Sequence, residues 1–448
     1  MSNIIIKQWS MVRPAEETPR KSIWLSSLDL TIRGPHTCTL YVYHPENSSM
    51  NSHNFFDATI LKESLSRALV PFYPMAGRLK EANHNGRLEI ECNGEGALLV
   101  EAETTQSLVD FGDFKPTPEL MRLVIPTCDY SRGHALIPLL MVQLTRFSCG
   151  GVTLGFAQHH RVADGVGHLH FINSWARLAR GLDLQVPPIH ERSPHLVPRN
   201  PPQVTFQHFE HDPPKRSPGD FVPSVNPGNE TTITSFFKIT NDQISALKQE
   251  ATSSEMNSNE YYKLSTYEVL AAHILRAACR ARGLADDQEV KLYIPVDGRY
   301  RLKSPALPRG FCGNAIFIAA YIAKSGDITR NPLGYIAGKI HETLKTMTDE
   351  EYLRSAIDYL ETQPNLTSLV RGAHTFKCPN LLVNSWLKFP IYEADFGWGK
   401  PLLAGRGGGT FDGLSYLVPS PNRDDGVLLM ISLLNQHMIL FEKYFYDF

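Results

Sequence analysis

Residues 155–165 read Gly-Phe-Ala-Gln-His-His-Arg-Val-Ala-Asp-Gly, and the chain is best interpreted outward from this stretch. An apolar run, Gly151 to Ala157, leads into it and predicts a strand, whereas the segment from Leu169 to Ala179 has its apolar residues at helical spacing. The strand must therefore end near His160, and the turn at Asp164 begins the helix.

His160 is the first candidate catalytic residue. A histidine at the end of a strand suits a general base, because its ordinary pKa of about 6.5 leaves it largely neutral at pH 7. Asp164, four residues later, could hold either the turn or the imidazole ring. This spacing occurs by chance in many proteins, so it also fits a structural histidine followed by a helix-capping aspartate.

A second motif lies far downstream, where residues 395–401 read Asp-Phe-Gly-Trp-Gly-Lys-Pro. Together with His160 and Asp164 it resembles the signature pair of the plant BAHD acyltransferases, which move acyl groups from coenzyme A thioesters to alcohols or amines. The resemblance covers nearly the whole chain. Its other blocks are Met-Val-Arg-Pro-Ala at 11–15, Val-Pro-Phe-Tyr-Pro-Met-Ala-Gly-Arg-Leu at 70–79, Val-Asp-Gly-Arg at 296–299 and Phe-Cys-Gly-Asn at 311–314.

Composition excludes several other classes of protein. The net charge of −2 supplies no basic field, so we expect no nucleic-acid partner. No run approaches the ~20 apolar residues of a membrane span, so we expect no stable membrane insertion. Seven cysteines, an odd number without a Cys-x-x-Cys pair, indicate reduced thiols. We expect a cytoplasmic protein and a monomer.

At 448 residues the chain is long enough for two domains. Prolines concentrate between Pro187 and Pro227, which predicts an extended crossover. We therefore expect an N-terminal domain at 1–186 with the HxxxD motif, a Pro-rich crossover at 187–230, and a C-terminal domain at 231–448 with the DFGWG motif. Strands alternate with helices, and many connections are too short for parallel crossovers, which predicts an α/β fold with antiparallel pairings. The resemblance implies two mixed-sheet sandwich domains like chloramphenicol acetyltransferase, with a channel between them.

The resemblance also implies roles for the motif residues. His160 would be the general base of a ternary complex, without an acyl-enzyme. Asp164 would either bind the ring of His160, as in a triad, or form a structural ion pair with Arg299; the resemblance favours the second. Asp395, Gly397, Trp398 and Gly399 would form a structural loop packed under a large ring.

Two further patterns are weaker signals. The glycine-rich residues 405–409 lack the Gly-Lys-Ser/Thr ending of a P-loop, so we expect a flexible loop there. His159, His160, His168 and His170 are close in sequence, but no zinc spacing with a third fixed ligand appears, and His168 and His170 cannot share one helix face. We expect no metal.

The acceptor pocket is defined only by the resemblance, which is greatest to the hydroxycinnamoyl-CoA:shikimate/quinate transferases and the anthranilate N-hydroxycinnamoyl/benzoyl transferases. Tyr41 and Arg371 stand where the shikimate enzymes contact the acceptor, and a guanidinium suits a carboxylate. Asn384 replaces the usual threonine. Trp386 would flank the acyl group or pack the wall. Asn384, Thr39 and Trp386 are candidate donors to the oxyanion.

The expected function is transfer of an aromatic acyl group, hydroxycinnamoyl or benzoyl, from coenzyme A to a small acceptor that carries a carboxylate. The coenzyme A thioester is a cosubstrate, and no bound cofactor is implied. Three alternatives stay open: the same chemistry on a neutral or alkaloid acceptor, a carrier-protein-dependent condensation domain, and a non-catalytic binding protein.

Overall fold

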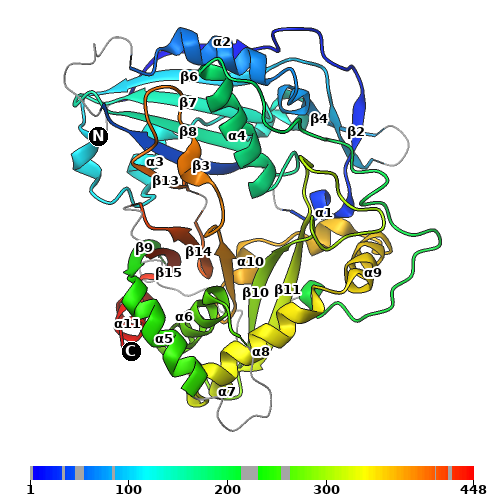
Figure 1. The fold of residues 1–448 in the computed structure, drawn as a ribbon, viewed down its shortest axis with the longest axis vertical. Coiled ribbons are helices and arrows are strands. Elements are labelled where there is room, and N and C mark those ends of the chain that lie inside the picture. Colours follow the sequence, from blue (N-terminus) through cyan, green and yellow to red (C-terminus); the bar gives the residue numbers. More distant parts are fainter. Residues whose placement is uncertain are drawn as a thin grey trace. The chain divides into compact units, whose positions relative to one another are not determined.

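The computed structural model describes residues 4–32, 36–45, 55–82, 86–212, 231–253, 263–408, 410–421 and 426–447 (Figure 1). The chain divides into two compact units. Unit 1 comprises residues 1–197, 302–315 and 389–409, and unit 2 comprises residues 198–301, 316–388 and 410–448. In the described part of the chain, no helix has both the length and the apolar content needed to cross a membrane.

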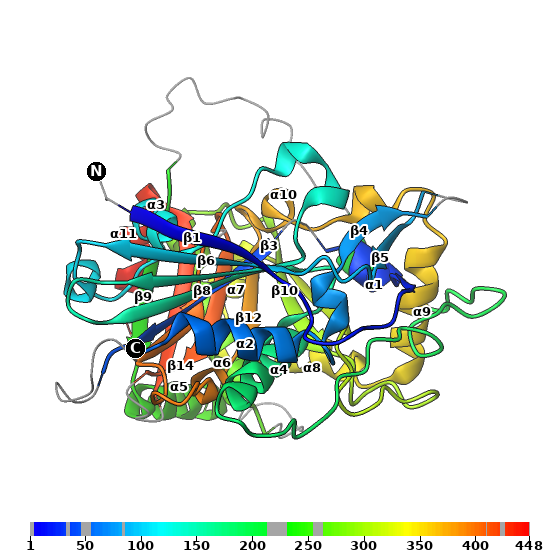
Figure 2. The same cartoon turned by 90° about the horizontal axis from the view of Figure 1, so that it is seen from above.

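Unit 1 is built on a six-stranded mixed sheet in the order β1-β6-β7-β8-β3-β13. Its strands are β1 (Ile4–Val12), β3 (His36–Tyr43), β6 (Ala97–Thr104), β7 (Leu140–Arg146), β8 (Val152–His159) and β13 (Leu403–Arg406). Strand β8 lies between β7 and β3 and is buried along its whole length. Figure 2 shows β1 running beside β6, its antiparallel partner.

Helices cover both faces of this sheet. Successive residues of β3 and β8 therefore pack alternately against the helices on one face and on the other. On one face, α4 (Gly165–Ala179) follows β8 directly, and α2 (Ala58–Ala68) packs beside α4 (Figure 1). Phe156 and Trp175 meet edge to face there, with ring centroids 5.9 Å apart. On the other face, α3 (Pro118–Val124) joins a core that contains Leu40 and Ala157.

Unit 1 also has a three-stranded sheet in the order β2-β5-β4, formed by β2 (Ser22–Trp24), β4 (Arg78–Glu81) and β5 (Leu88–Glu91). The short helix α1 (Ser27–Leu30) follows β2 directly. Its capping box pairs Ser26 with Asp29, so this carboxylate is fixed by local backbone donors.

Unit 2 contains the second six-stranded mixed sheet, in the order β11-β10-β12-β14-β15-β9. Its strands are β9 (Thr232–Ile239), β10 (Glu289–Asp297), β11 (Ile316–Lys324), β12 (Leu381–Ser385), β14 (Leu414–Pro419) and β15 (Val427–Leu434). The helices are α5 (Asn241–Ser253), α6 (Thr266–Arg282), α7 (Ser325–Arg330), α8 (Leu333–Thr346), α9 (Glu350–Glu361), α10 (Ala373–Phe376) and α11 (Asn435–Phe445). A capping box of Ser265 and Glu268 begins α6, and Gly283, in the left-handed conformation, ends it.

Two mixed sheets with covering helices confirm the expected α/β class, but the two units do not follow the expected boundaries at 186 and 231. Residues 302–315 and 389–409 belong to unit 1, so the DFGWG motif lies there and not with residues 231–301. The physical reason is strand pairing: β13 hydrogen-bonds to β3, with Arg406 opposite Thr39. The expectation of a loop at 405–409 was accordingly wrong for Gly405 and Arg406, which are strand residues.

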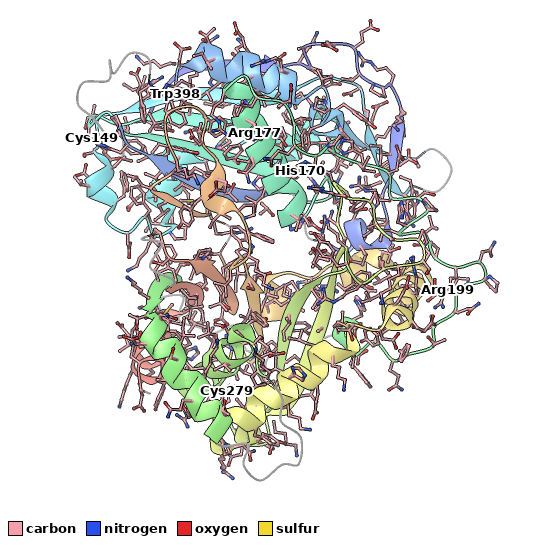
Figure 3. The ribbon with its side chains drawn as sticks, in the orientation of Figure 1. Cys149, His170, Arg177, Arg199, Cys279 and Trp398 are labelled. Carbon is pink, nitrogen blue, oxygen red and sulfur yellow. The ribbon has the colours of Figure 1, made fainter. Side chains whose placement is uncertain are left out.

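The expected Pro-rich crossover is divided between the units. Residues 187–197 belong to unit 1 and residues 198–212 to unit 2, while 213–230 lie outside the described residues. Arg199, labelled in Figure 3, ties the crossover to α9, because its Nε donates to Asp358 at 2.6 Å and its Nη1 donates to Glu351 at 2.8 Å.

The close approach of α3 to β8 yields a stability prediction. A Cβ placed on Gly155 would lie 1.7 Å from the carbonyl oxygen of Val124, so Gly155→Ala must move backbone. We expect the substitution to lower the free energy of unfolding by about 1–3 kcal/mol or more. The matched control is Gly405→Ala on β13, where a Cβ meets no atom within 4 Å. Denaturant midpoints compare the two variants, and equal midpoints would contradict the close approach.

Candidate active site

His160 stands one residue beyond β8, half-buried at the start of the turn to α4. Burial lowers the pKa of this imidazole below its ordinary 6.5, and the nearby Arg406 also lowers it, against the opposing effects of Asp164 and Asn314. His160 is therefore neutral at pH 7, the state in which it can accept a proton. Its neighbour His159 packs edge to face on His36, with centroids 5.4 Å apart, and is buried.

The tautomer of His160 follows from the amide of Asn314. Asn314 Nδ2 donates to the carbonyl oxygen of His160 at 2.9 Å and to Asp29 Oδ1 at 2.7 Å. Asn314 Oδ1 is thus the atom that faces the ring, 3.1 Å from His160 Nδ1. An amide oxygen only accepts, so Nδ1 carries the hydrogen and Nε2 has the free lone pair. This lone pair is the one that a general base needs.

A buried carboxylate holds Asn314 in place. Asp29 and Arg192 form an ion pair in which both side chains are fully buried, with Asp29 Oδ2 3.2 Å from Arg192 Nε. Asp29 also accepts from the backbone N–H of Asn314 at 3.2 Å and from the hydroxyl of Ser26 at 2.7 Å. Asp29 thus holds Asn314, and Asn314 orients the ring of His160. The carboxylate of Asp29 makes none of these hydrogen bonds to the ring itself.

Asp164 serves as the N-cap of α4. Its Oδ1 accepts from the backbone N–H of Gly167 at 3.1 Å, and its Oδ2 accepts from the backbone N–H of Ala315 at 3.0 Å. The side chain is buried. These bonds join the turn after His160 to the 302–315 segment of unit 1, which is a structural role.

Arg299, the expected partner of Asp164, belongs to unit 2. Its guanidinium lies 3.1 Å from Asp297 Oδ1, and its backbone N–H donates to the same carboxylate at 2.9 Å. The ion pair between Asp164 and Arg299 stays a prediction.

The DFGWG motif forms a tight loop on unit 1. Asp395 Oδ1 accepts from the backbone N–H groups of Gly397 at 2.8 Å and Gly399 at 3.0 Å. Both glycines have a positive φ, +106° and +97°, which residues with a side chain rarely adopt. Trp398, labelled in Figure 3, packs 4.9 Å from the ring of Phe56. The motif's own bonds are therefore those of a structural turn.

Two of the expected acceptor residues lie on β3, facing α4. Thr39 is buried, and its hydroxyl lies 2.9 Å from His168 Nε2. Tyr41 is 1% exposed and packs edge to face on Phe156, with centroids 5.6 Å apart. The structure thus places Tyr41 in the core of unit 1, where burial strongly raises the pKa of its phenol.

The other three expected acceptor residues lie in unit 2. Arg371 Nη1 donates to His211 Nδ1 at 3.0 Å, which requires a neutral His211. Burial lowers the pKa of Arg371 to about 10, opposed by the charge of Glu210. Asn384 lies on β12 opposite Tyr416, and Trp386 packs on the same tyrosine at 5.1 Å.

Three polar residues in unit 1 that we did not predict from the sequence take part in this site: Asp29, Asn314 and His168. Asn314 occurs in a family-like block, yet no local pattern indicates its partner, because His160 is 154 positions away. His168 shares the face of α4 that meets the sheet, while His170 Nε2 lies 2.9 Å from the carbonyl oxygen of Val186. Within the described ranges, no group of three or more His, Cys, Asp or Glu side chains could hold a metal ion.

Comparison with known proteins identifies the family of this chain. Residues 2–448 match the model described as the Transferase family. The chain is 49% identical to anthranilate N-benzoyltransferase protein 2 of Dianthus caryophyllus, with all of both chains covered. It is 51% identical to shikimate O-hydroxycinnamoyltransferase of Nicotiana tabacum, with 99% of this chain and all of that one covered.

Solved structures support the fold. Vinorine synthase superposes with a TM-score of 0.71 at 22% identity, over 98% of this chain and 96% of that one. The F. sporotrichioides protein TRI101, in complex with coenzyme A and T-2, also gives 0.71 at 22% identity, over 93% and 96% of the two chains.

The contacts of Asp164 generate a second prediction. In Asp164→Asn the amide oxygen can accept only one of the two N–H groups now bound, and the NH2 group faces the other. We expect a loss of about 1–3 kcal/mol in stability, measured by denaturant unfolding.

A double-mutant cycle with Arg299→Ala then tests the ion pair. A coupling energy above about 0.5 kcal/mol would support the pair, and additive effects would exclude it. Arg301→Ala, a nearby arginine in the same turn, is the control and should be additive with Asp164→Asn.

Proposed function

Because the chain belongs to the Transferase family, the family of the plant BAHD acyltransferases, we propose that it transfers a hydroxycinnamoyl or benzoyl group from coenzyme A to a small acceptor. The coenzyme A thioester is the cosubstrate. The single observation that supports a catalytic role is the neutral His160, whose Nδ1–H is held by Asn314 and whose Nε2 is left free to take a proton.

The proposed step needs no covalent enzyme intermediate. The acceptor nitrogen or oxygen attacks the thioester carbonyl carbon while His160 Nε2 removes its proton. The tetrahedral intermediate then collapses, the carbon–sulfur bond breaks, and the thiolate leaves with the proton that His160 gives back. Asn314 keeps the ring in the required tautomer throughout, and such a base is typically worth roughly 10²–10⁴-fold in rate.

We further propose that the acceptor carries a carboxylate, as shikimate, quinate and anthranilate do, and that Arg371 binds it. A guanidinium taken out of water benefits from an anionic partner. Arg371 donates to a neutral histidine, and the charge of Glu210 only partly offsets the effect of burial on the pKa of its guanidinium. We also propose that the acceptor pocket includes four other residues: Thr39, Tyr41, Asn384 and Trp386. Tyr41 is buried and would support the wall of this pocket.

The same proposal includes a monomer that acts in the cytoplasm. All seven cysteines are free thiols in the structure, which is consistent with a reducing compartment.

One assay tests the proposed reaction: release of free thiol from hydroxycinnamoyl- and benzoyl-CoA with a panel of acceptors, with each product identified by mass. Thiol release that depends on an added alcohol or amine supports the transferase. Thiol release without product indicates hydrolysis, and no release with any acceptor would point to a binding protein.

His160→Ala should lower kcat by about 10²-fold or more with little change in the KM for acyl-CoA. For the wild type, kcat/KM should fall as pH drops below the lowered pKa of His160, since protonation removes the base. His159→Ala is the control at the neighbouring position. In this variant kcat/KM should fall at the same low pH as in the wild type. Near-normal turnover by folded His160→Ala would contradict the base assignment.

Arg371→Leu should raise the KM for a carboxylate acceptor by about one to two orders of magnitude, from the loss of roughly 1.5–3 kcal/mol of charged hydrogen bonding. The KM for acyl-CoA should not change. A neutral acceptor of the same size serves as the control, and its KM should not rise. If carboxylate acceptors are unaffected by Arg371→Leu, the proposed pocket is wrong.

A further inference from the structure

One hydrogen bond determines which edge of the Arg371 guanidinium stays available to a ligand. Its Nη1 donates to His211 Nδ1 at 3.0 Å. Among the described residues, Nε and Nη2 of the same guanidinium make no hydrogen bond. Arg371 is half-buried, and both residues belong to unit 2. The bond to His211 is therefore the one contact of this kind that orients the charged group.

The same bond places the hydrogen of His211. Every guanidinium nitrogen is a donor, so Nδ1 of the imidazole must accept. Burial and the charge of Arg371 hold the pKa of this ring well below its ordinary 6.5, so at pH 7 the ring carries a single hydrogen, which is on Nε2. His211 Nε2 lies 3.9 Å from Glu210 Oε1. The N–H end of the ring is thus beside a carboxylate, and its lone-pair end is beside the guanidinium.

Two donors hold the carboxylate of Glu210. The hydroxyl of Tyr352 donates to Oε2 at 3.0 Å, and His208 Nδ1 lies 2.8 Å from Oε1. The other nitrogen of His208, Nε2, is 2.9 Å from the hydroxyl of Ser355. That oxygen accepts from the backbone N–H of Thr205 at 3.0 Å, so its own hydrogen is given to His208 Nε2. The hydrogen of His208 is consequently on Nδ1 and is given to Glu210.

Helix α9 fixes the plane of the His211 ring. The ring of Tyr359 stacks on it, with centroids 5.5 Å apart and ring planes at 23°. The side chain of His211 is 5% exposed, which leaves it little freedom to turn. The start of the same segment is also tied to α9, because Arg199 binds Asp358. His211 therefore presents its Nδ1 in a direction that is set before any ligand binds.

The position of His211 leaves the side-on edge of the guanidinium intact. A guanidinium binds a carboxylate most strongly through two parallel N–H bonds. One such pair is Nε–H and Nη2–H, which lie on the same edge, and the other pair is Nη1–H and Nη2–H at the tip. The bond to His211 uses Nη1, so it engages the tip and not the Nε/Nη2 edge.

We propose that His211 is a positioning residue for the acceptor: by accepting from Nη1 it presents the Nε/Nη2 edge of Arg371, where both oxygens of the acceptor carboxylate bind side by side. This deepens the acceptor proposal made above and rests on it. The neutral ring also keeps Glu210 one residue away from the guanidinium. A carboxylate bound directly to Arg371 would compete with the acceptor for the same hydrogens, whereas a neutral imidazole does not.

Anthranilate and 2-aminobenzamide are matched probes, because they share the nucleophile and differ only in a carboxylate or a neutral carboxamide. Shikimate and its carboxamide serve in the same way if shikimate is the acceptor that is turned over. His211→Phe keeps a ring against Tyr359 but has no acceptor atom. It should raise the KM for the carboxylate acceptor by about 3- to 10-fold, the effect of one hydrogen bond, and leave the KM for the carboxamide within about 2-fold.

His211→Asn is the conservative variant. Asn Oδ1 and His Nδ1 are both bonded to Cγ, so the amide oxygen can accept from Arg371 where the imidazole nitrogen did. The KM for the carboxylate acceptor should stay within about 2-fold of the wild type, although the ring is lost. A KM raised as much in His211→Asn as in His211→Phe would contradict the role of the acceptor atom.

A double variant separates positioning from a general structural role. A structural role would lower kcat for both acceptors by the same factor and would leave both KM values unchanged. If His211 acts through the guanidinium, adding His211→Phe to Arg371→Leu should not raise the KM for the carboxylate acceptor any further. Equal changes for both acceptors, or additive effects in the double variant, would overturn the proposal.

A measurement on the wild type does not depend on a variant that folds. ¹⁵N NMR of histidine-labelled protein reports which ring nitrogen carries hydrogen, and we expect hydrogen on Nε2 and a bare Nδ1 for His211. Hydrogen on Nδ1 would overturn the inference. If Arg371→Leu leaves carboxylate acceptors unaffected, the proposed acceptor pocket fails and the role of His211 falls with it. If Arg371→Leu raises their KM and His211→Phe does not, the positioning role alone is overturned.

Discussion

The arrangement of the segments around His160 in unit 1 depends on the hydrogen bonds and the ion pair made by the carboxylate of Asp29. It is fully buried and receives hydrogens from Ser26, Arg192 and Asn314, which come from three distant parts of the chain. A buried charge is tolerated only when such donors are all in place, and removing one partner of a buried pair typically costs about 3–5 kcal/mol. The network therefore fixes where the 302–315 segment lies, and with it the amide that contacts His160.

Asp164 holds the 302–315 segment at a second point. Its carboxylate accepts from the backbone N–H of Ala315 in that segment and from the backbone N–H of Gly167 in its own helix. A carboxylate four residues after a histidine suggests a triad, but these backbone donors use both of its oxygens for structure. The group that contacts the ring of His160 is instead the neutral side chain of Asn314.

Local signals in the sequence predicted local structure well. The apolar run before His160 is a buried strand, and Asp164 caps the next helix. These features depend on residues within four positions of one another, so periodicity and capping chemistry suffice to find them.

Contacts between distant segments could not be predicted in this way. Nothing in residues 403–406 indicates that they pair with β3, more than 350 positions earlier, so the sequence did not indicate that the DFGWG motif lies in unit 1. His168 was considered only as a metal ligand, because its partner Thr39 is 129 positions away. The hydrogen bond of Arg371 to His211 was missed for the same reason.

His160 and His168 show how a neutral amide can set the chemistry of an imidazole. Each ring gives its Nδ1 hydrogen to an amide oxygen, Asn314 Oδ1 for His160 and Gln158 Oε1 for His168. Each amide is oriented by a backbone carbonyl that its NH2 group must face. The tautomer is thus specified through an amide, which for Asn314 is held by Asp29 as well as by a main-chain carbonyl, and no carboxylate contacts the ring in these bonds.

This choice of partner has a consequence for catalysis. A carboxylate bound to Nδ1 would raise the pKa of the ring by stabilising the imidazolium, whereas an amide does so only weakly. Burial then dominates, and both rings stay neutral. In the proposed mechanism, an imidazolium formed at His160 during attack would be short-lived, because the departing thiolate would accept its proton. The hydroxyl of Thr39 lies at Nε2 of His168. Of these two rings, the one proposed to take the proton of the acceptor at Nε2 is therefore that of His160.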